Sequence, residues 1–151
     1  DYVLADIPGL ISGAHEGSGL GDRFLGHIER CAVLLHLVDG TELDPGAAYR
    51  TVRGELSAYG EGLAEKLEIV CLNKCDALNA EQRARRLKSL AAAVGGSVTA
   101  LSGVSGQGIE EALRGLWRAI EDKKHAAAEA KATAAGGESK KRIYDPLAGY
   151  S

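Results

Sequence analysis

Three short segments contain the residues best suited to bind a ligand, and each directly follows an apolar run. They are Asp6-Ile7-Pro8-Gly9, Asn73-Lys74-Cys75-Asp76 and Ser102-Gly103-Val104. Carboxylates bind hard metal ions, while amides, lysine and backbone N–H groups beside glycine recognise the polar edges of a small molecule. Because ligands bind outside the carboxyl ends of strands in open α/β sheets, we expect the three segments to form one site.

The segment 73–76 carries the most specific chemistry. A carboxylate placed like Asp76 can accept hydrogen bonds from the ring N–H and the exocyclic amine of guanine, whereas adenine lacks that pair of donors. Asn73 would tie the loop together and reach the base, and Lys74 would lay its aliphatic stem along the ring. The alternative is an Asx-type turn that closes a strand and binds nothing.

The other two segments would complete the site. The backbone N–H of Gly103 would reach the guanine carbonyl oxygen, with Ser102 and Val104 beside it. Asp6 is suited to hold Mg²⁺ through water, and Gly9 offers a backbone N–H to a phosphate. Taken alone, each segment is also compatible with an ordinary turn or helix start.

Alternating strands and helices must position these segments. Continuous apolar runs, or helical spacing of apolar residues, predict strands over 2–5, 32–38, 67–72 and 97–101, and helices over 20–30, 47–59, 81–94 and 109–124. This alternation predicts an α/β fold with a doubly wound, mostly parallel sheet that is covered on both faces.

The length and composition favour one domain followed by a tail. Chains of 151 residues can bury a single core, and we expect that domain to span residues 1–124. From residue 125 onward the composition shifts to Ala, Lys, Glu and Gly, so residues 125–151 are expected to be a disordered or frayed tail, part of which could continue the last helix.

The charge and the apolar pattern exclude several classes of partner. A net charge of −3 gives no general attraction to nucleic acid, so no DNA binding is predicted. The sequence has no apolar run long enough to cross a membrane, and a cytoplasmic location is expected. The three cysteines are an odd number and are expected to be thiols rather than disulfides.

A longer pattern gives a family resemblance. It consists of Asp6-Ile-Pro-Gly-Leu-Ile, Gly13-Ala-His-Glu-Gly and Gly19-Leu-Gly-Asp-Arg-Phe-Leu-Gly-His-Ile-Glu-Arg30. This pattern closely resembles the second switch region of the Obg family of bacterial GTPases. Segments 73–76 and 102–108 also resemble the base-recognition loops of that family, so the resemblance covers about residues 1–123.

The resemblance implies a P-loop NTPase-like fold and a GTPase that binds GTP or GDP with Mg²⁺. It also implies a role in assembly of the large ribosomal subunit, with that subunit and its RNA as partners. Family members carry a phosphate loop, a first switch and a glycine-rich domain ahead of the position of Asp1, and no Gly-Lys pair occurs here. The chain is therefore expected to be an N-terminally truncated G domain, with a gap in its sheet and no activity alone.

Two positions depart from the expected pattern. Many switch GTPases have a water-orienting Gln where this chain has Leu10, so the catalytic residue is unknown. His15 or Glu16 could replace it, against the alternative that both are solvated loop residues. Gly103 stands where the family more often has Ala, a change that keeps the N–H group.

Other functions fit the sequence less well. The main alternative is a non-catalytic chain that acts as a protein or ribosome interaction module. A hydrolase elbow and a nicotinamide-binding loop both fail on the spacing of their glycines. His27 and His36 are expected to be structural, since neither has a carboxylate at ligand spacing, and Trp117 is expected in the core.

Overall fold

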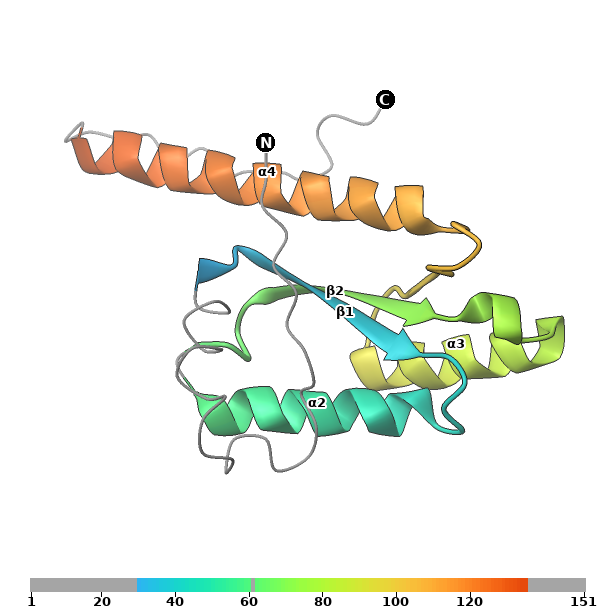
Figure 1. The fold of residues 1–151 in the computed structure, drawn as a ribbon. Helices are drawn as coiled ribbons and strands as arrows, with labels where there is room; N and C mark the ends of the chain where they lie inside the picture. The colour runs from blue at the N-terminus through green and yellow to red at the C-terminus, as the bar shows by residue number, and fades with distance from the viewer. Residues whose placement is uncertain (1–29, 61, 136–151) are drawn as a thin grey trace. The chain divides into compact units, whose positions relative to one another are not determined.

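The computed structural model describes residues 30–60 and 62–135. The strand predicted over 2–5, nearly all of the helix predicted over 20–30 and the segment 6–9 lie outside these residues. Figure 1 shows the described elements in chain order: β1 (Val33–Asp39), α2 (Pro45–Tyr59), β2 (Leu67–Asn73), the 3₁₀ turn η2 (Cys75–Ala77), α3 (Ala80–Val94), β3 (Thr99–Ala100) and α4 (Ile109–Ala135).

The three described strands form one parallel sheet in the order β1-β2-β3. The register of β1 on β2 runs from Val33 opposite Leu67 to Asp39 opposite Asn73. Parallel pairing requires crossover connections, and α2 and α3 provide them. The predicted α/β class with a parallel sheet is therefore confirmed, and the carboxyl ends of β1 and β2 finish side by side.

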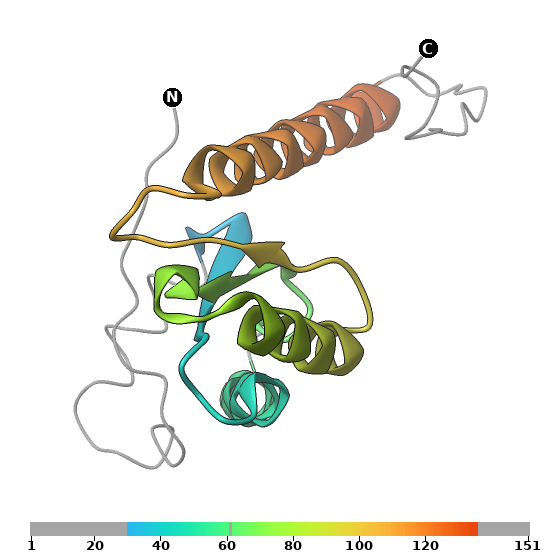
Figure 2. The same cartoon turned by 90° about the vertical axis from the view of Figure 1, so that its right-hand side faces the viewer.

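Helices cover both faces of the sheet, as the two views in Figures 1 and 2 show. Helices α2 and α3 pack on one face around a core that includes Tyr49, Leu72 and Leu90. On the other face the first part of α4 contributes Ala112, which packs with Cys71 and Leu101. Strands buried on both faces need apolar residues at successive positions, which explains the continuous apolar runs.

Local signals fix the ends of the two crossover helices. The Asp44 carboxylate caps α2 by accepting a hydrogen bond from Ala47 N at 3.0 Å. Asn79 and Gln82 form a reciprocal capping box at the start of α3. Gly95 ends α3 in the left-handed conformation, with φ 72°. The starts of α2 and α3 set where the loops after β1 and β2 finish, and Gly95 sets where the connection to β3 begins.

The cysteines agree with the sequence-based expectation. None of the three is in a disulfide, and Cys71 and Cys75 are buried. Cys75 Sγ donates to the carbonyl oxygen of Leu72 at 3.2 Å, which fastens the start of η2 to the end of β2.

The C-terminal part of the chain differs from its predicted boundaries. Strand β3 has only two residues, because only Cys71 and Leu72 of β2 pair with it. Helix α4 continues through Ala135, beyond the predicted end at residue 124, since Ala, Glu and Lys are strong helix formers. Trp117 is 52% exposed, so its predicted place in the core is wrong.

The chain divides into two compact units after Ile120. In the second unit, the described residues 121–135 continue the α4 helix, and those at 122–134 are exposed. The division of the chain into a domain at 1–124 and a tail at 125–151 stays a prediction. None of the described helices combines the length and the apolar character that a membrane span needs.

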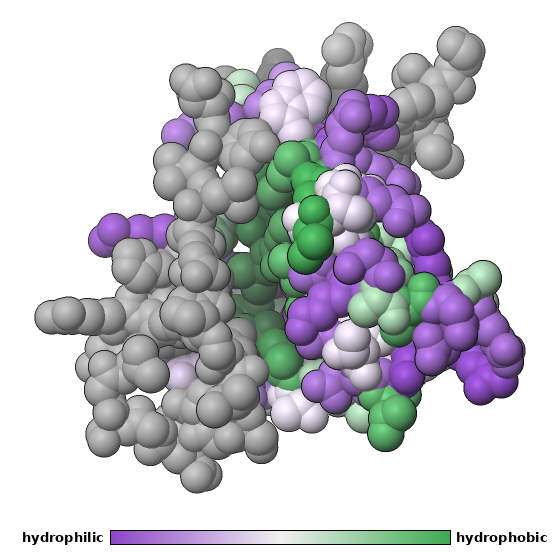
Figure 3. Space-filling view, turned by 45° about the vertical axis from the view of Figure 1, so that its right-hand side comes forward, coloured by the Kyte–Doolittle hydropathy of each residue, from purple (hydrophilic) through white to green (hydrophobic). Residues whose placement is uncertain are grey.

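Some apolar side chains of the first unit face solvent. Leu37 of β1 is 48% exposed and Leu67 at the start of β2 is 45% exposed. Figure 3 shows apolar residues gathered in a band beside a largely polar surface. In the described part of the chain, β1 pairs with β2 alone.

Candidate functional site

The loops that follow β2 and β3 meet at the carboxyl edge of the sheet. Backbone hydrogen bonds run from Leu101 N to Leu72 O at 2.9 Å and from Cys75 N to Leu101 O at 3.1 Å. The chain thus passes from β3 directly alongside η2. In Figure 1 the arrowheads of β1 and β2 point to the same side of the molecule, where these loops lie.

The segment 73–76 has an unusual backbone at its second residue. Lys74 adopts φ 62° and ψ 31°, and in the described chain it is the one non-glycine residue with a positive φ. The left-handed conformation costs an L-residue about 1–2 kcal/mol. Asn73 Oδ1 accepts a hydrogen bond from Lys74 N at 2.8 Å and helps to hold it. Such strain at a strand end is a sign of a functional constraint.

Two side-chain hydrogen bonds join the segments at 73–76 and 102–104. Gly103 N donates to Asn73 Oδ1 at 3.2 Å. Ser102 Oγ donates to Asp76 Oδ1 at 2.6 Å. Two segments that lie far apart in the sequence therefore form one continuous surface, built from residues that were predicted to bind a base.

Ser102 holds together the junction, which is the contact between segments 73–76 and 102–104. Its side chain is fully buried, and Ser102 Oγ also accepts a hydrogen bond from Ser105 N at 3.0 Å. Its backbone closes the loop through Ser102 N to Gln107 O at 2.8 Å and Gly106 N to Ser102 O at 2.9 Å. Asp76 itself is exposed, so the carboxylate is held through Oδ1 and still faces solvent.

Gly103 and Val104 form the outer part of the junction. Both are exposed, Val104 to 90%. A Cβ added at Gly103 would lie 3.9 Å from Asn73 Oδ1, an ordinary contact that leaves room for Ala. The Gly103 N–H that was predicted to reach a guanine carbonyl oxygen is bonded to Asn73, so a bound base would share or exchange that hydrogen bond.

Lys74 forms an ion pair with Asp39 at the end of β1. Lys74 Nζ lies 2.6 Å from Asp39 Oδ2, and Asp39 Oδ1 accepts from Thr41 N and Thr41 Oγ1 at 2.9 and 2.6 Å. Partial burial alone would raise the pKa of Asp39, but the hydrogen bonds from Lys74 and Thr41 outweigh it and lower the pKa to about 2. The hydrogen bond to Asp39 raises the pKa of Lys74.

Sequence reasoning did not identify Asp39 as part of the site. The signal was its position, because the last residue of one parallel strand lies beside the last residue of the next. The register places Asp39 directly opposite Asn73.

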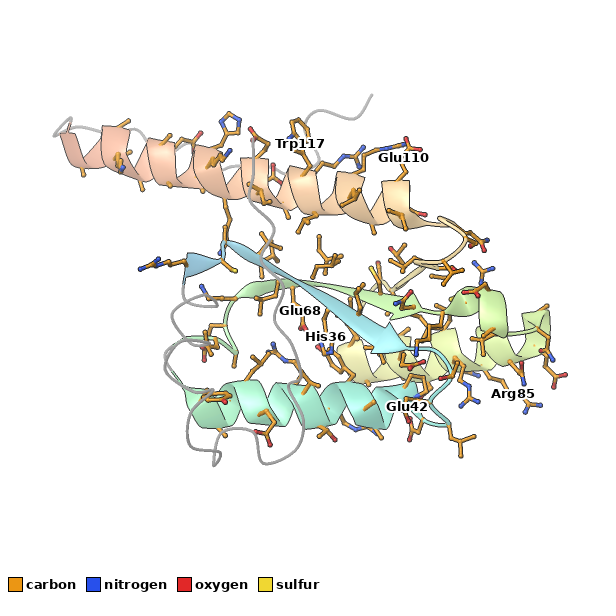
Figure 4. All side chains as sticks on the ribbon, viewed as in Figure 1. His36, Glu42, Glu68, Arg85, Glu110 and Trp117 are labelled. Carbon is orange, nitrogen blue, oxygen red and sulfur yellow. The ribbon has the colours of Figure 1, made fainter. Side chains whose placement is uncertain are left out.

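His36 has a carboxylate partner that spacing along the chain does not reveal. His36 Nδ1 lies 2.6 Å from Oε1 of Glu68 on the neighbouring strand, and Figure 4 shows both side chains between the strands and α2. Tyr49 Oη donates to Glu68 Oε2 at 3.2 Å, and Arg53 Nη1 lies 3.3 Å from the same oxygen. The absence of a carboxylate at ligand spacing along the chain therefore did not exclude a carboxylate partner in space, and the structural role expected for His36 stays a prediction.

The remaining predicted site residues lie outside the described residues. They are Asp6, Ile7, Pro8 and Gly9, together with the loop residues Leu10, His15 and Glu16. The assignment of Asp6 to magnesium stays a prediction. Within residues 30–60 and 62–135, no cluster of three or more His, Cys, Asp or Glu side chains could hold a metal ion.

Comparison with known families adds an independent observation. Residues 1–74 match the family model described as 50S ribosome-binding GTPase. The matched range contains segment 6–9 and also Asn73 and Lys74, and it ends before Asp76. The match supports a GTPase family and a GTP-binding role for this chain.

Proposed function

We propose that this chain forms the guanine-binding part of a GTP-binding and GTP-hydrolysing switch protein of the Obg type. The observation that carries the proposal is the pair of hydrogen bonds that join the two loops, Ser102 Oγ to Asp76 Oδ1 and Gly103 N to Asn73 Oδ1. An isolated Asx turn needs no partner loop, whereas a base pocket needs both. The family match over residues 1–74 supports the same conclusion.

Each residue of the junction has a distinct task in this proposal. The carboxylate of Asp76 accepts hydrogen bonds from guanine, and Ser102 holds it in place by donating to Oδ1. Asn73 joins the loops and reaches the base, while the stem of Lys74 lies along the ring. Gly103 and Val104 bring backbone N–H groups to the carbonyl edge of the base.

In this proposal the segment 6–9 binds the phosphate end of the nucleotide. Asp6 would hold Mg²⁺ through water, and Ile7, Pro8 and Gly9 would follow the phosphates. An Mg²⁺ ion held by Asp6 would supply positive charge to offset the negative charge that develops during phosphoryl transfer. We assign no residue to water activation, because the side chain of Leu10 cannot form a hydrogen bond.

The ribosomal role rests on the resemblance to the Obg family and on the description of the matched family. We propose the large ribosomal subunit and its RNA as partners, in the cytoplasm. The alternative, a non-catalytic interaction module, would retain guanine binding without hydrolysis. Single-turnover hydrolysis of GTP by the complete protein separates the two, since the module would release no phosphate.

The substitution Asp76→Asn tests the guanine assignment. In the complete protein it should weaken GTP binding by about 10²-fold or more and improve binding of xanthosine triphosphate, because the amide donates where the carboxylate accepted. Competition binding with both nucleotides measures the change. Asp122→Asn, an exposed aspartate on α4, is the matched control. An unchanged preference in Asp76→Asn would remove this residue from base selection.

A further inference from the structure

We propose that Asp39 is a positioning residue of the guanine site. It binds the Lys74 ammonium, so that the aliphatic stem of Lys74 is already oriented to pack along the base. The inference rests on the proposed function for its effect on nucleotide binding. The ion pair itself belongs to the protein without ligand: Lys74 Nζ lies 2.6 Å from Asp39 Oδ2.

The end of β1 is built to hold Asp39 in place. Thr41 donates to Asp39 Oδ1 through both its backbone N and its hydroxyl. Gly40 N donates to Asn73 O at 2.9 Å, and a Cβ at Gly40 would lie only 2.5 Å from that oxygen. The carboxylate of Asp39 therefore has a fixed position relative to the first residue of the base-binding loop.

Lys74 is held at both of its ends. At the backbone, Asn73 Oδ1 accepts from Lys74 N and φ is 62°. At the tip, the ammonium contacts Asp39. A lysine side chain has many rotamers, and ordering one when a ligand binds weakens affinity. Here the ordering precedes binding, so the base meets a side chain that is already in position.

This ion pair differs from two other exposed pairs among the described residues. Glu81 with Arg85 and Glu110 with Arg114 are pairs within one helix turn, a class that contributes little to stability. Asp39 and Lys74 are 35 residues apart, and the carboxylate belongs to a network that includes Thr41. With a pKa of about 2, Asp39 is ionised throughout the physiological pH range. Its contribution is therefore positional and independent of pH there.

A double-mutant cycle on the complete protein tests the inference. The variants are Asp39→Asn and Lys74→Met, which keeps the apolar stem but removes the ammonium, and the measurement is the dissociation constant for fluorescent GDP. Asp39→Asn should weaken binding about tenfold in the wild-type background, as expected for one freed long side chain. With Lys74→Met already present, Asp39→Asn should change the constant by less than about twofold, because its target is gone.

Controls separate positioning from folding. Asp44→Asn makes the same charge change in the same loop and should leave GDP binding unchanged, since Asp44 caps α2. If Asp39→Asn fails to fold, Thr41→Val removes one hydrogen bond to Asp39 and should weaken binding by about threefold, again only when Lys74 is intact. Equal losses in both backgrounds, or no loss in either, would overturn the inference.

A measurement without nucleotide separates this inference from the proposed function. The acylation rate of Lys74, followed by mass spectrometry in the ligand-free protein, should rise in Asp39→Asn and stay constant in Asp44→Asn. An unchanged rate would show that Asp39 does not hold the ammonium. If the wild-type protein bound no guanine nucleotide, the proposed function would fail, while the acylation rate would still decide whether Asp39 positions Lys74.

Discussion

Ser102 is the single side chain on which the junction of the two loops depends most. It donates to Asp76 and accepts from Ser105 N, and it is completely buried. Removing a buried hydroxyl that both donates and accepts a hydrogen bond leaves two partners unsatisfied, which lowers the free energy of unfolding. The structure is needed to see this role, because a serine in a glycine-rich loop is common and does not by itself indicate which residues it contacts.

The substitution Ser102→Ala should therefore affect both stability and binding. We expect the free energy of unfolding to fall by about 1–3 kcal/mol, since the buried hydroxyl's hydrogen bonds to the Asp76 carboxylate and from Ser105 N are both lost. Guanine affinity should fall further than adenine affinity, because Asp76 loses the donor that orients it. Denaturant unfolding and nucleotide competition measure the two effects. Ser105→Ala is the control, and the prediction is wrong if both variants behave alike.

Residue types were predicted better than residue partners. Asn73, Lys74 and Asp76 attract attention because amide, ammonium and carboxylate follow a buried strand. Asp39 does not, since a single acidic residue at a strand end has many explanations. The register of β1 on β2 brings Asp39 next to Lys74, and spacing along the chain does not reveal that register.

At the scale of elements, the strands and the two crossover helices were predictable for physical reasons. A strand covered on both faces must be largely apolar, and β1 and β2 are, apart from His36 and Glu68 in their interiors and Asp39 and Asn73 at their ends. Strand β3 was predicted too long, because its length is set by how much of β2 remains to pair. The first part of α4 was predicted from its apolar stripe, although Trp117 turned out to face solvent.

A cluster of polar and charged side chains between the sheet and α2 joins β1, β2 and α2 by ion pairs and hydrogen bonds. It consists of Glu68 on β2, His36 on β1, and Tyr49 and Arg53 on α2. Arg53 Nη1 is buried and makes no hydrogen bond within the described chain, yet it lies 3.3 Å from Glu68 Oε2. Glu68 therefore compensates a partly buried positive charge, since the Arg53 side chain is 28% exposed.

Replacing Glu68 by Gln should destabilise the protein and change its response to acid. Removing one partner of this partly buried ion pair should cost about 1–3 kcal/mol, because the guanidinium of Arg53 stays partly desolvated. Burial alone would raise the pKa of Glu68, but the hydrogen bond from His36 and the charge of Arg53 outweigh it, so the pKa lies below its ordinary value of 4.5. This part of the stability is present above pH 4.5 and is lost as the pH falls through the lower folded value.

Chemical denaturation between pH 7 and pH 3 measures this effect. The difference in unfolding free energy between wild type and Glu68→Gln should be largest near neutrality and shrink in acid. Glu65→Gln, an exposed residue in the turn before β2, should show neither effect. A difference that stays constant with pH would contradict the role assigned to the Glu68 charge.

At the scale of the whole molecule, none of the described residues 121–134 of the second unit is buried. The described residues from 122 to 134 are exposed, whereas Leu116 in the first unit is only 3% exposed. Helix propensity explains why the Ala-rich stretch is helical without packing. The sequence showed that nothing there could bury a core, but it did not show where the helix would end.

Removing residues 125–151 should therefore leave the first unit almost unchanged. We expect the free energy of unfolding to change by less than about 0.5 kcal/mol, while the helical circular dichroism signal falls. Ending the chain at Gly115 instead removes Leu116 and should cost about 2–5 kcal/mol. Equal losses from the two truncations would show that the Ala-rich helix contributes to the stability of the first unit.

Two buried cysteines, Cys71 and Cys75, lie at the end of β2 and in the turn that follows it, so their reactivity reports on local opening there. Burial, with a smaller effect of Glu111, raises the pKa of Cys71 to about 11, so at neutral pH its thiol is both protonated and shielded. Cys75 lies within the segment 73–76, for which we propose base binding, and is only 3% exposed. Since the thiolate is the reactive form, alkylation of either sulfur requires the end of β2 to separate from its neighbours. The alkylation rate therefore measures how often the end of β2 and the loop after it open, and a nucleotide that held the two loops together would slow the reaction.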